Sequence, residues 1–381
     1  GQADERSPRE PHDHPFPDLF STYADPGSLR SSCSQASAMQ GLPLYRRDRH
    51  PLIPMQTTLE QMRQAIAESI TSRGFAQRTP QGLFAPIDYT LALGGKRLRP
   101  LLCTVAASAF SPSWKDALPV AVALEIFHNF TLLHDDLMDA SPLRRGQETV
   151  YRKWSVNTAI LSGDAMSIEA YSVLGEVQRP ELIGGLFQRF SQMALEVCVG
   201  QQLDMEFETR SDVTSAEYME MIRLKTSVLL GCALELGALV GGASEVDAKK
   251  LYEAGISLGL AFQIQDDLLD VYGEEATFGK PIGGDIIHAK KTLLLLHTLE
   301  TLTGASLEKL EALLSLTPEE RKGQVDAVRA LYDEAGTRTF AEREVTRLTT
   351  KAYQQIEALN LRPEGKALLI QLFNTLSGRT K

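Results

Sequence analysis

Cysteine is scarce in this chain of 381 residues, and positive charge is outweighed by negative charge. None of the cysteines forms a C-x-x-C pair, and three lie in apolar helical context, so we expect reduced core thiols in a cytosolic protein. The four are Cys33, Cys103, Cys198 and Cys232. The net charge of -10 argues against a general nucleic-acid binder. Local basic clusters can still bind phosphate groups.

Long apolar runs are also missing. The stretch nearest to membrane length, Leu229–Ala243, is interrupted by Glu235 and is rich in glycine. It is too short and too polar to span a bilayer. We therefore predict no transmembrane segment, and a buried helix at this place that lets a neighbour pack closely.

Residues 1–54 differ in composition from the rest of the chain. They are rich in proline, serine, aspartate and arginine and have no apolar periodicity, which is typical of disorder. They lack the apolar centre of a secretory signal, and their acidic residues do not fit a transit peptide. We expect a disordered tail or a segment added for expression, followed by one folded domain over 55–381.

Helical periodicity dominates the remaining sequence. Apolar residues recur every three to four positions, and no segment alternates as a half-buried strand does. Capping boxes at Thr214-x-x-Glu217 and Thr317-Pro318-x-Glu320 mark two helix starts. The sequence predicts an all-α protein, one large bundle around a central active-site cavity. The expected helices span about 59–70, 88–110 (interrupted near its start by two glycines), 117–140, 158–177, 180–208, 215–241 and 245–272, with four or five shorter ones over 290–376.

The motif D-D-x-x-D occurs twice, each time inside an apolar helical run. Residues four apart share a helix face, so the outer aspartates of each motif point the same way. Like charges at this spacing repel, and Mg²⁺ prefers carboxylate oxygens that it shares with substrate phosphates. We predict a magnesium–diphosphate site between two facing helices; a solvated acidic face is the alternative. The aspartates are Asp135, Asp136, Asp139, Asp266, Asp267 and Asp270.

Clustered basic residues accompany the aspartates. The segment Gly94-Gly95-Lys96-Arg97-Leu98-Arg99-Pro100 combines three cations with glycines that let the backbone approach a phosphate closely. Charged turns and surface salt bridges are the alternatives, but the whole pattern suits two diphosphate groups with metal ions. The other basic residues are Arg144, Arg145, Lys225, Lys280, Lys290 and Lys291.

His128 lies two helical turns before the first motif. A lone histidine on an apolar helix is more often a core side chain than a ligand. Glu125-x-x-His128 is half of a di-iron motif, but the sequence offers no second Glu-x-x-His.

With these motifs, the chain resembles the trans-isoprenyl diphosphate synthases, the family of farnesyl and geranylgeranyl diphosphate synthases. The resemblance covers about 55–381. It rests on GGKRLRP at 94–100, HDDLMD and RRG within 134–146, KT at 225–226, and FQIQDDLLD with GKPIGGD within 262–285.

The resemblance implies Mg²⁺ as cofactor, isopentenyl and allylic diphosphates as substrates, and a homodimer. It also implies roles for individual residues. The six aspartates would hold magnesium ions, and the allylic diphosphate would contact Arg144, Lys225, Lys280 and Lys290. Isopentenyl diphosphate would contact Lys96, Arg99, His128 and Arg145. Thr226 and Gln263 would line the reaction centre.

Product length in such an enzyme follows the depth of the cavity. Phe130, followed by Thr131, lies five positions before the first motif and resembles the cavity floor of short-chain members. We expect geranylgeranyl diphosphate as product, with farnesyl diphosphate next. Two other functions stay open: a terpene cyclase, which generally has a different second metal motif, and a non-catalytic subunit, which often loses one aspartate motif.

Overall fold

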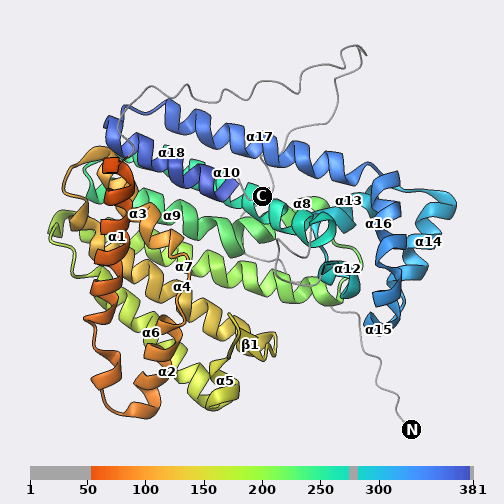
Figure 1. The fold of residues 1–381 in the computed structure, drawn as a ribbon, viewed down its shortest axis with the longest axis horizontal. Coiled ribbons are helices and arrows are strands. Elements are labelled where there is room, and N and C mark those ends of the chain that lie inside the picture. The colour runs from red at the N-terminus through yellow and green to blue at the C-terminus, as the bar shows by residue number, and fades with distance from the viewer. Residues whose placement is uncertain (1–52, 274–281, 378–381) are drawn as a thin grey trace, which may run out of the picture. The chain divides into compact units, whose positions relative to one another are not determined.

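Helices account for most of the residues that the computed structural model describes, which are 53–273 and 282–377 (Figure 1). The first half contains α1 (Ile53–Thr71), α2 (Gln81–Ala92), α3 (Leu98–Phe110), α4 (Leu118–Met138), α5 (Val150–Lys153), α6 (Val156–Leu174) and α7 (Pro180–Thr209). The second half contains α8 (Ser215–Ile222), α9 (Val228–Val240), α10 (Glu245–Tyr272), α12 (Gly284–Ile287), α13 (Leu293–Thr301), α14 (Gly304–Leu314), α15 (Pro318–Arg321), α16 (Val325–Glu334), α17 (Thr337–Glu357) and α18 (Pro363–Ser377). The all-α prediction is confirmed.

Helix α9 forms the centre of the bundle. All its residues are buried, because its sequence is apolar on every side. It packs against α3, α7 and α10, and Figure 1 shows α17, α10, α9 and α7 running side by side. A Cβ atom on Gly237 would lie only 2.1 Å from the carbonyl oxygen of Cys103 on α3. The prediction of a buried, closely packed helix at 229–243 is confirmed.

The long predicted helices are confirmed as α4, α6, α7 and α10, and both capping boxes form. The interruption predicted near the start of 88–110 is confirmed, and it is large enough to make two separate helices. The stretch is split into α2 and α3, because Gly94 and Gly95 have φ angles of 72° and 139° that a helix cannot continue through. The predicted helix over 215–241 contains a π-helical turn at Arg223–Ser227. The C-terminal helices number six in the described part, and α17 is long.

A small hairpin contradicts the expectation of no strands. Strands β1 (Leu143–Arg144) and β2 (Gln147–Glu148) pair antiparallel around Arg145 and Gly146, whose φ angles of 54° and 78° suit a tight two-residue turn. Tyr89 on α2 donates a hydrogen bond of 2.8 Å to the carbonyl oxygen of Glu148. The hairpin is thereby tied to α2.

Two further expectations concern cysteines and membranes. Cys103 and Cys232 are buried free thiols as predicted, but Cys198 is exposed on α7, and Cys33 lies outside the described residues. Among the described residues, Trp114–Met138 is long and apolar enough to cross a membrane, yet 61% of its most apolar window is buried in the protein, as in a core helix. The predicted tail at 1–54 lies, except for its last two residues, outside the described part.

Candidate active site

The first aspartate cluster sits where α4 ends. Asp135 and Asp136 belong to its last turn, and Asp139 is the C-terminal cap. Asp136 is buried, Asp135 is half-buried and Asp139 is exposed. Negative charge is unfavourable at a helix C-terminus. The cluster therefore requires cations from neighbouring elements.

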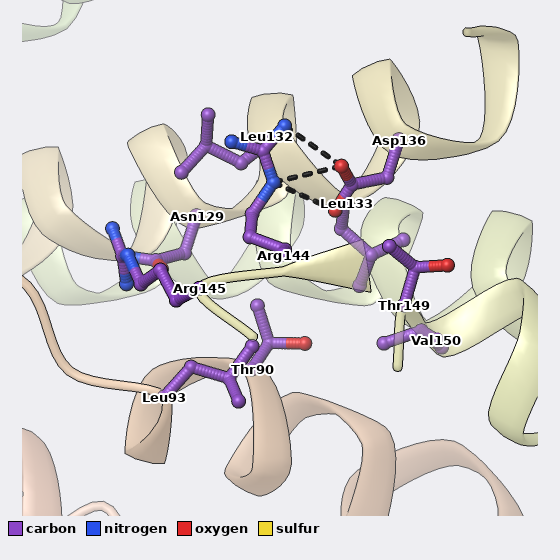
Figure 2. A pocket seen from close by; sticks show the side chains of 10 residues that line it. All are labelled: Thr90, Leu93, Asn129, Leu132, Leu133, Asp136, Arg144, Arg145, Thr149 and Val150. Atoms are coloured by element: carbon purple, nitrogen blue, oxygen red, sulfur yellow. Dashed lines mark hydrogen bonds and ion pairs between the residues drawn. The ribbon is translucent and has the colours of Figure 1, made fainter. Parts of the chain in front are cut away.

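Arg144, on strand β1, supplies the first cation (Figure 2). Its Nε lies 2.7 and 2.8 Å from the two carboxylate oxygens of Asp136, and its Nη2 lies 3.6 Å from Asp135. Burial raises the pKa of Asp136, and the hydrogen bond from Arg144 offsets only part of this effect. The pair borders a small pocket whose other walls include Leu93, Leu133 and Arg145.

Lys225 supplies the second cation. Its Nζ lies 2.6 Å from Oδ2 of Asp204 on α7 and 3.4 Å from Oδ1 of Asp135. Burial lowers the pKa of Lys225, but Asp135 and Asp204 more than compensate and raise it above its ordinary value, so the side chain stays charged. Oδ1 of Asp135 is buried and accepts no hydrogen bond. The sequence analysis missed Asp204, because an isolated carboxylate on a mixed-polarity helix gives no motif.

The backbone around Lys225 adopts the π-helical turn. Ser227 Oγ donates to the carbonyl oxygen of Ile222 at 3.4 Å, and two glycines let the flanking helices approach. A Cβ on Gly200 of α7 would lie 2.3 Å from the backbone nitrogen of Lys225. One on Gly259 of α10 would lie 2.7 Å from Cα of Ser227. Such single π turns are frequent at functional sites.

The next residue in the π turn, Thr226, reaches the helix that carries the second motif. Its Oγ1 lies 3.4 Å from Oε1 of Gln263 on α10. Two of the predicted reaction-centre residues are therefore in contact.

The second aspartate cluster lies near the end of α10. Asp267 is buried, and its Oδ2 accepts a hydrogen bond of 2.5 Å from the hydroxyl of Tyr218. Burial raises the pKa of Asp267 to about 8, and nearby Asp285 adds to the shift. Asp270 accepts a 2.8 Å hydrogen bond from the backbone nitrogen of Asp285, and Asp266 is half-buried.

Lys290 connects the two clusters electrostatically. Loss of water around its Nζ lowers its pKa, but surrounding carboxylates raise it above the ordinary value. These carboxylates are Asp285 on α12, Asp204 on α7, Asp267 of the second cluster and Asp139 of the first cluster. The two motifs therefore face a common space, as the sequence analysis expected.

The carboxylates do not form a ready metal centre in this arrangement. Over 58–273 and 282–377, no three Asp, Glu, His or Cys side chains are close enough together to hold an ion. Asp136, Asp267 and Asp270 each accept a hydrogen bond from a protein donor.

The predicted isopentenyl diphosphate residues gather beside the hairpin. Nη1 of Arg99 lies 3.0 Å from Nε2 of His128. Burial, then Arg99, holds the pKa of His128 well below its ordinary value, so the ring is neutral and accepts this hydrogen bond. Burial also lowers the pKa of Arg99 to about 10, and its Nε is buried without a hydrogen-bond partner. Arg145 packs on Gly95, where a Cβ would lie 2.8 Å from its Nη2, and Lys96 is exposed.

Aromatic rings fill the space beneath the first cluster. The ring of Phe130 meets that of His134 at 4.9 Å and that of Phe127 at 5.3 Å, both edge to face. Phe127 in turn meets Phe190 of α7 at 5.3 Å. Thr131 turns its hydroxyl back to the carbonyl of His128 on its own helix. The sequence analysis missed Phe127 and Phe190, whose helical spacing is also that of ordinary core residues.

The predicted diphosphate ligand Lys280 lies outside the described residues.

Comparison with known proteins identifies the family. Residues 80–334 match the family described as polyprenyl synthetase. The chain belongs to the polyprenyl synthetase family. It is 38% identical over 304 residues to a geranylgeranyl diphosphate synthase of Methanosarcina mazei, which covers 79% of this chain and 90% of that protein. It is 32% identical over 330 residues to a geranylfarnesyl diphosphate synthase of Natronomonas pharaonis, covering 82% and 94%.

Solved structures of polyprenyl synthetases have the same fold. A crystal structure of a geranylgeranyl pyrophosphate synthase, 44% identical, superposes with a TM-score of 0.79 and covers 85% of this chain and 99% of that one. A geranylgeranyl pyrophosphate synthase of Corynebacterium glutamicum, 25% identical with a TM-score of 0.73 over 85% and 99% of the chains, was solved with isoprenyl diphosphate and magnesium. The resemblance drawn from the motifs is confirmed, and the chain is a trans-prenyl diphosphate synthase.

Proposed function

We propose that this polyprenyl synthetase condenses isopentenyl diphosphate with an allylic diphosphate, head to tail and in the trans configuration, and releases pyrophosphate. The observation that carries the proposal is Lys225, held between Asp135 and Asp204 and followed directly by Thr226 in contact with Gln263. A cation, carboxylates and neutral oxygens thus meet at one place between α4, α7 and α10. The allylic primer would be dimethylallyl, geranyl or farnesyl diphosphate.

Magnesium fits the donors of the first cluster. Oδ1 of Asp135, which accepts no hydrogen bond, and the exposed Asp139 offer hard oxygen atoms on one helix face. Asp266 would face them from α10. Bound magnesium would neutralise the charge that develops on the leaving diphosphate. We propose it as the cofactor.

The basic side chains would bind the two diphosphates separately. Arg144, Lys225 and Lys290, with Lys280, would hold the allylic diphosphate beside the aspartates. Lys96, Arg99, His128 and Arg145 would hold isopentenyl diphosphate by the hairpin. The hydroxyl of Thr226 and the amide oxygen of Gln263 would direct their negative ends toward the allylic cation. The proton lost after attack would go to the departing pyrophosphate, and apolar side chains between the helices would exclude water.

Geranylgeranyl diphosphate is the product that we propose, and farnesyl diphosphate is the second candidate. The support is Phe130, whose ring meets that of Phe127 one helical turn before the first cluster and would block a longer chain there. Relatives named for geranylgeranyl and geranylfarnesyl products have similar sequences.

A homodimer and a cytoplasmic location complete the proposal. Apolar side chains are exposed at helical spacing on α6 and on α7. The two helices are neighbours, because Tyr171 of α6 packs against Phe187 and Phe190 of α7. Such a patch marks an association surface. The exposed residues are Ile160, Leu161, Ile168, Leu195 and Val199. Replacing Ile168, which is 71% exposed, with Glu should give monomers in light scattering, whereas a wild-type monomer would refute the dimer. The buried free thiols of Cys103 and Cys232 suit the cytoplasm.

The deciding assay uses the purified chain with isopentenyl diphosphate and each allylic primer, with magnesium and with a chelator. We expect linear prenyl diphosphates only with magnesium. Asp135→Ala should remove most turnover while circular dichroism shows an intact fold, because Lys225 keeps its ion pair with Asp204. Cyclic hydrocarbons would indicate a terpene cyclase, and turnover only with a second protein would indicate a supporting subunit. Near-native rates for Asp135→Ala would refute its metal role.

A further inference from the structure

One contact joins the second aspartate motif to a helix outside it. Tyr218 on α8 is 1% exposed, and Asp267 on α10 is 4% exposed. The tyrosine hydroxyl donates to Oδ2 of Asp267 at 2.5 Å, within an apolar cluster that includes Phe207, Met221 and Ile264. A buried carboxylate and a buried hydroxyl need such a partner, because either alone would lose its water without compensation.

The position of Asp267 on α10 separates it from its neighbours. It shares its helix face with Ile264, Leu268 and Val271, all of which are buried. Gln263, Asp266 and Asp270 lie on a different face, at spacings of three and four residues, and remain partly accessible. Gln263 meets Thr226, so this second face is the one directed at the reaction centre. The carboxylate of Asp267 is instead directed at Tyr218 on α8.

The contact also fixes the segment that carries the catalytic lysine. Helix α8 ends at Ile222 and continues without a break into the π turn at Arg223–Ser227. Tyr218 lies seven residues before Lys225 in the sequence. Its bond to Asp267 therefore ties α8 to α10 just before Lys225 and Thr226, in addition to the contacts that the π turn itself makes with α10 at Gly259 and Gln263.

We propose that Tyr218 is a positioning residue for prenyl transfer and that Asp267 is its buried anchor, not a carboxylate that contacts magnesium or diphosphate. This inference rests on the proposed function, since it assigns roles within that same site. It divides the second motif into two parts. Asp266 and Asp270 serve the reaction centre, and Asp267 holds the helix that presents Lys225.

The test is Tyr218→Phe, which removes one hydroxyl and keeps the ring. The matched control is Tyr272→Phe, at the end of the α10 helix that carries Asp267. The Tyr272 hydroxyl donates a hydrogen bond of 3.0 Å to Asp333 on α16 and has no bond to the segment that carries Lys225. We expect kcat/KM for the allylic substrate to fall about ten- to a hundredfold in Tyr218→Phe, the factor expected when a buried acceptor is left without its hydrogen bond. The KM for isopentenyl diphosphate and the kinetics of Tyr272→Phe should stay at wild-type values. If the bond served stability alone, Tyr218→Phe would unfold more easily but would not lower kcat/KM for the allylic substrate selectively.

A double-mutant cycle with Asp267→Asn tests the anchor role. We expect the losses in kcat/KM of Tyr218→Phe and Asp267→Asn not to multiply, and the magnesium concentration for half-maximal rate to stay unchanged in both. The losses of stability of the two single variants, measured by thermal unfolding in chelator where no turnover occurs, should likewise not add up in the double variant. Wild-type kinetics in Tyr218→Phe, or losses that multiply together with a raised magnesium requirement in Asp267→Asn, would overturn the inference. A wild-type chain that fails to condense the substrates would instead overturn the proposed function.

Discussion

Replacing Phe130 with alanine should lengthen the product by one isoprene unit. The next ring down the helix, Phe127, lies three residues earlier, which is about 4.5 Å of helix rise. An extended chain gains about 3.5 Å for every three bonds, so the four in-line carbon–carbon bonds of an isoprene unit span about 4.7 Å. The two lengths agree. The growing chain should therefore advance by one unit and stop against Phe127, which Phe190 supports from α7.

The assay is mass spectrometry of the dephosphorylated products, with geranylgeranyl and geranylfarnesyl standards. The double variant Phe127→Ala and Phe130→Ala should yield still longer chains. It will also be less stable, since removal of a buried phenylalanine ring costs about 3–5 kcal/mol. Phe340→Ala is the control, because this half-buried ring stacks on His297 at 4.0 Å on α13 and α17, outside the aromatic floor. Unchanged product lengths in both Phe130 variants would refute the floor.

Two other predictions concern the backbone around Lys225 and the protonation of His128. Gly200→Ala should displace the π turn and destabilise the protein by about 1–3 kcal/mol, with loss of turnover, because its Cβ would lie 2.3 Å from Lys225 N. Gly184→Ala on the same α7 helix meets nothing within 4 Å and should keep full activity and gain stability in thermal unfolding; equal effects of the two changes would contradict this reasoning. Burial and Arg99 depress the pKa of folded His128, so its contribution to stability is present above about pH 6.5 and is lost as the pH falls below that value. Unfolding temperatures from about pH 7.5 to 5.5 should fall less steeply for His128→Gln than for the wild type, and parallel curves would exclude His128 as the cause.

The sequence was sufficient for the helices and the aspartate motifs, because apolar periodicity and paired charges are local properties. It placed Asp135 and Asp266 on the correct helices, whereas the grouping of Arg99 with His128 came from the family resemblance. The π turn could not be predicted, since it depends on Gly200 of another helix, and glycine has several meanings in a sequence. The hairpin around Arg145 was missed because arginine is an atypical residue for a tight turn. Tertiary partners such as Asp204 and Tyr218 could not be predicted, because no sequence motif connects them with the distant residues that they contact.

The internal ion pairs of the acidic clusters bear on how the enzyme rests between turnovers. Arg144 and Lys225 already neutralise Asp136 and Asp135 from within the molecule. When substrate and metal bind, these side chains exchange their internal ion-pair partners for ligands. Binding therefore does not have to stabilise a bundle that repels itself. The protein should consequently purify as a folded molecule in EDTA. Its ligands should change the rate of turnover more than they change the stability of the fold.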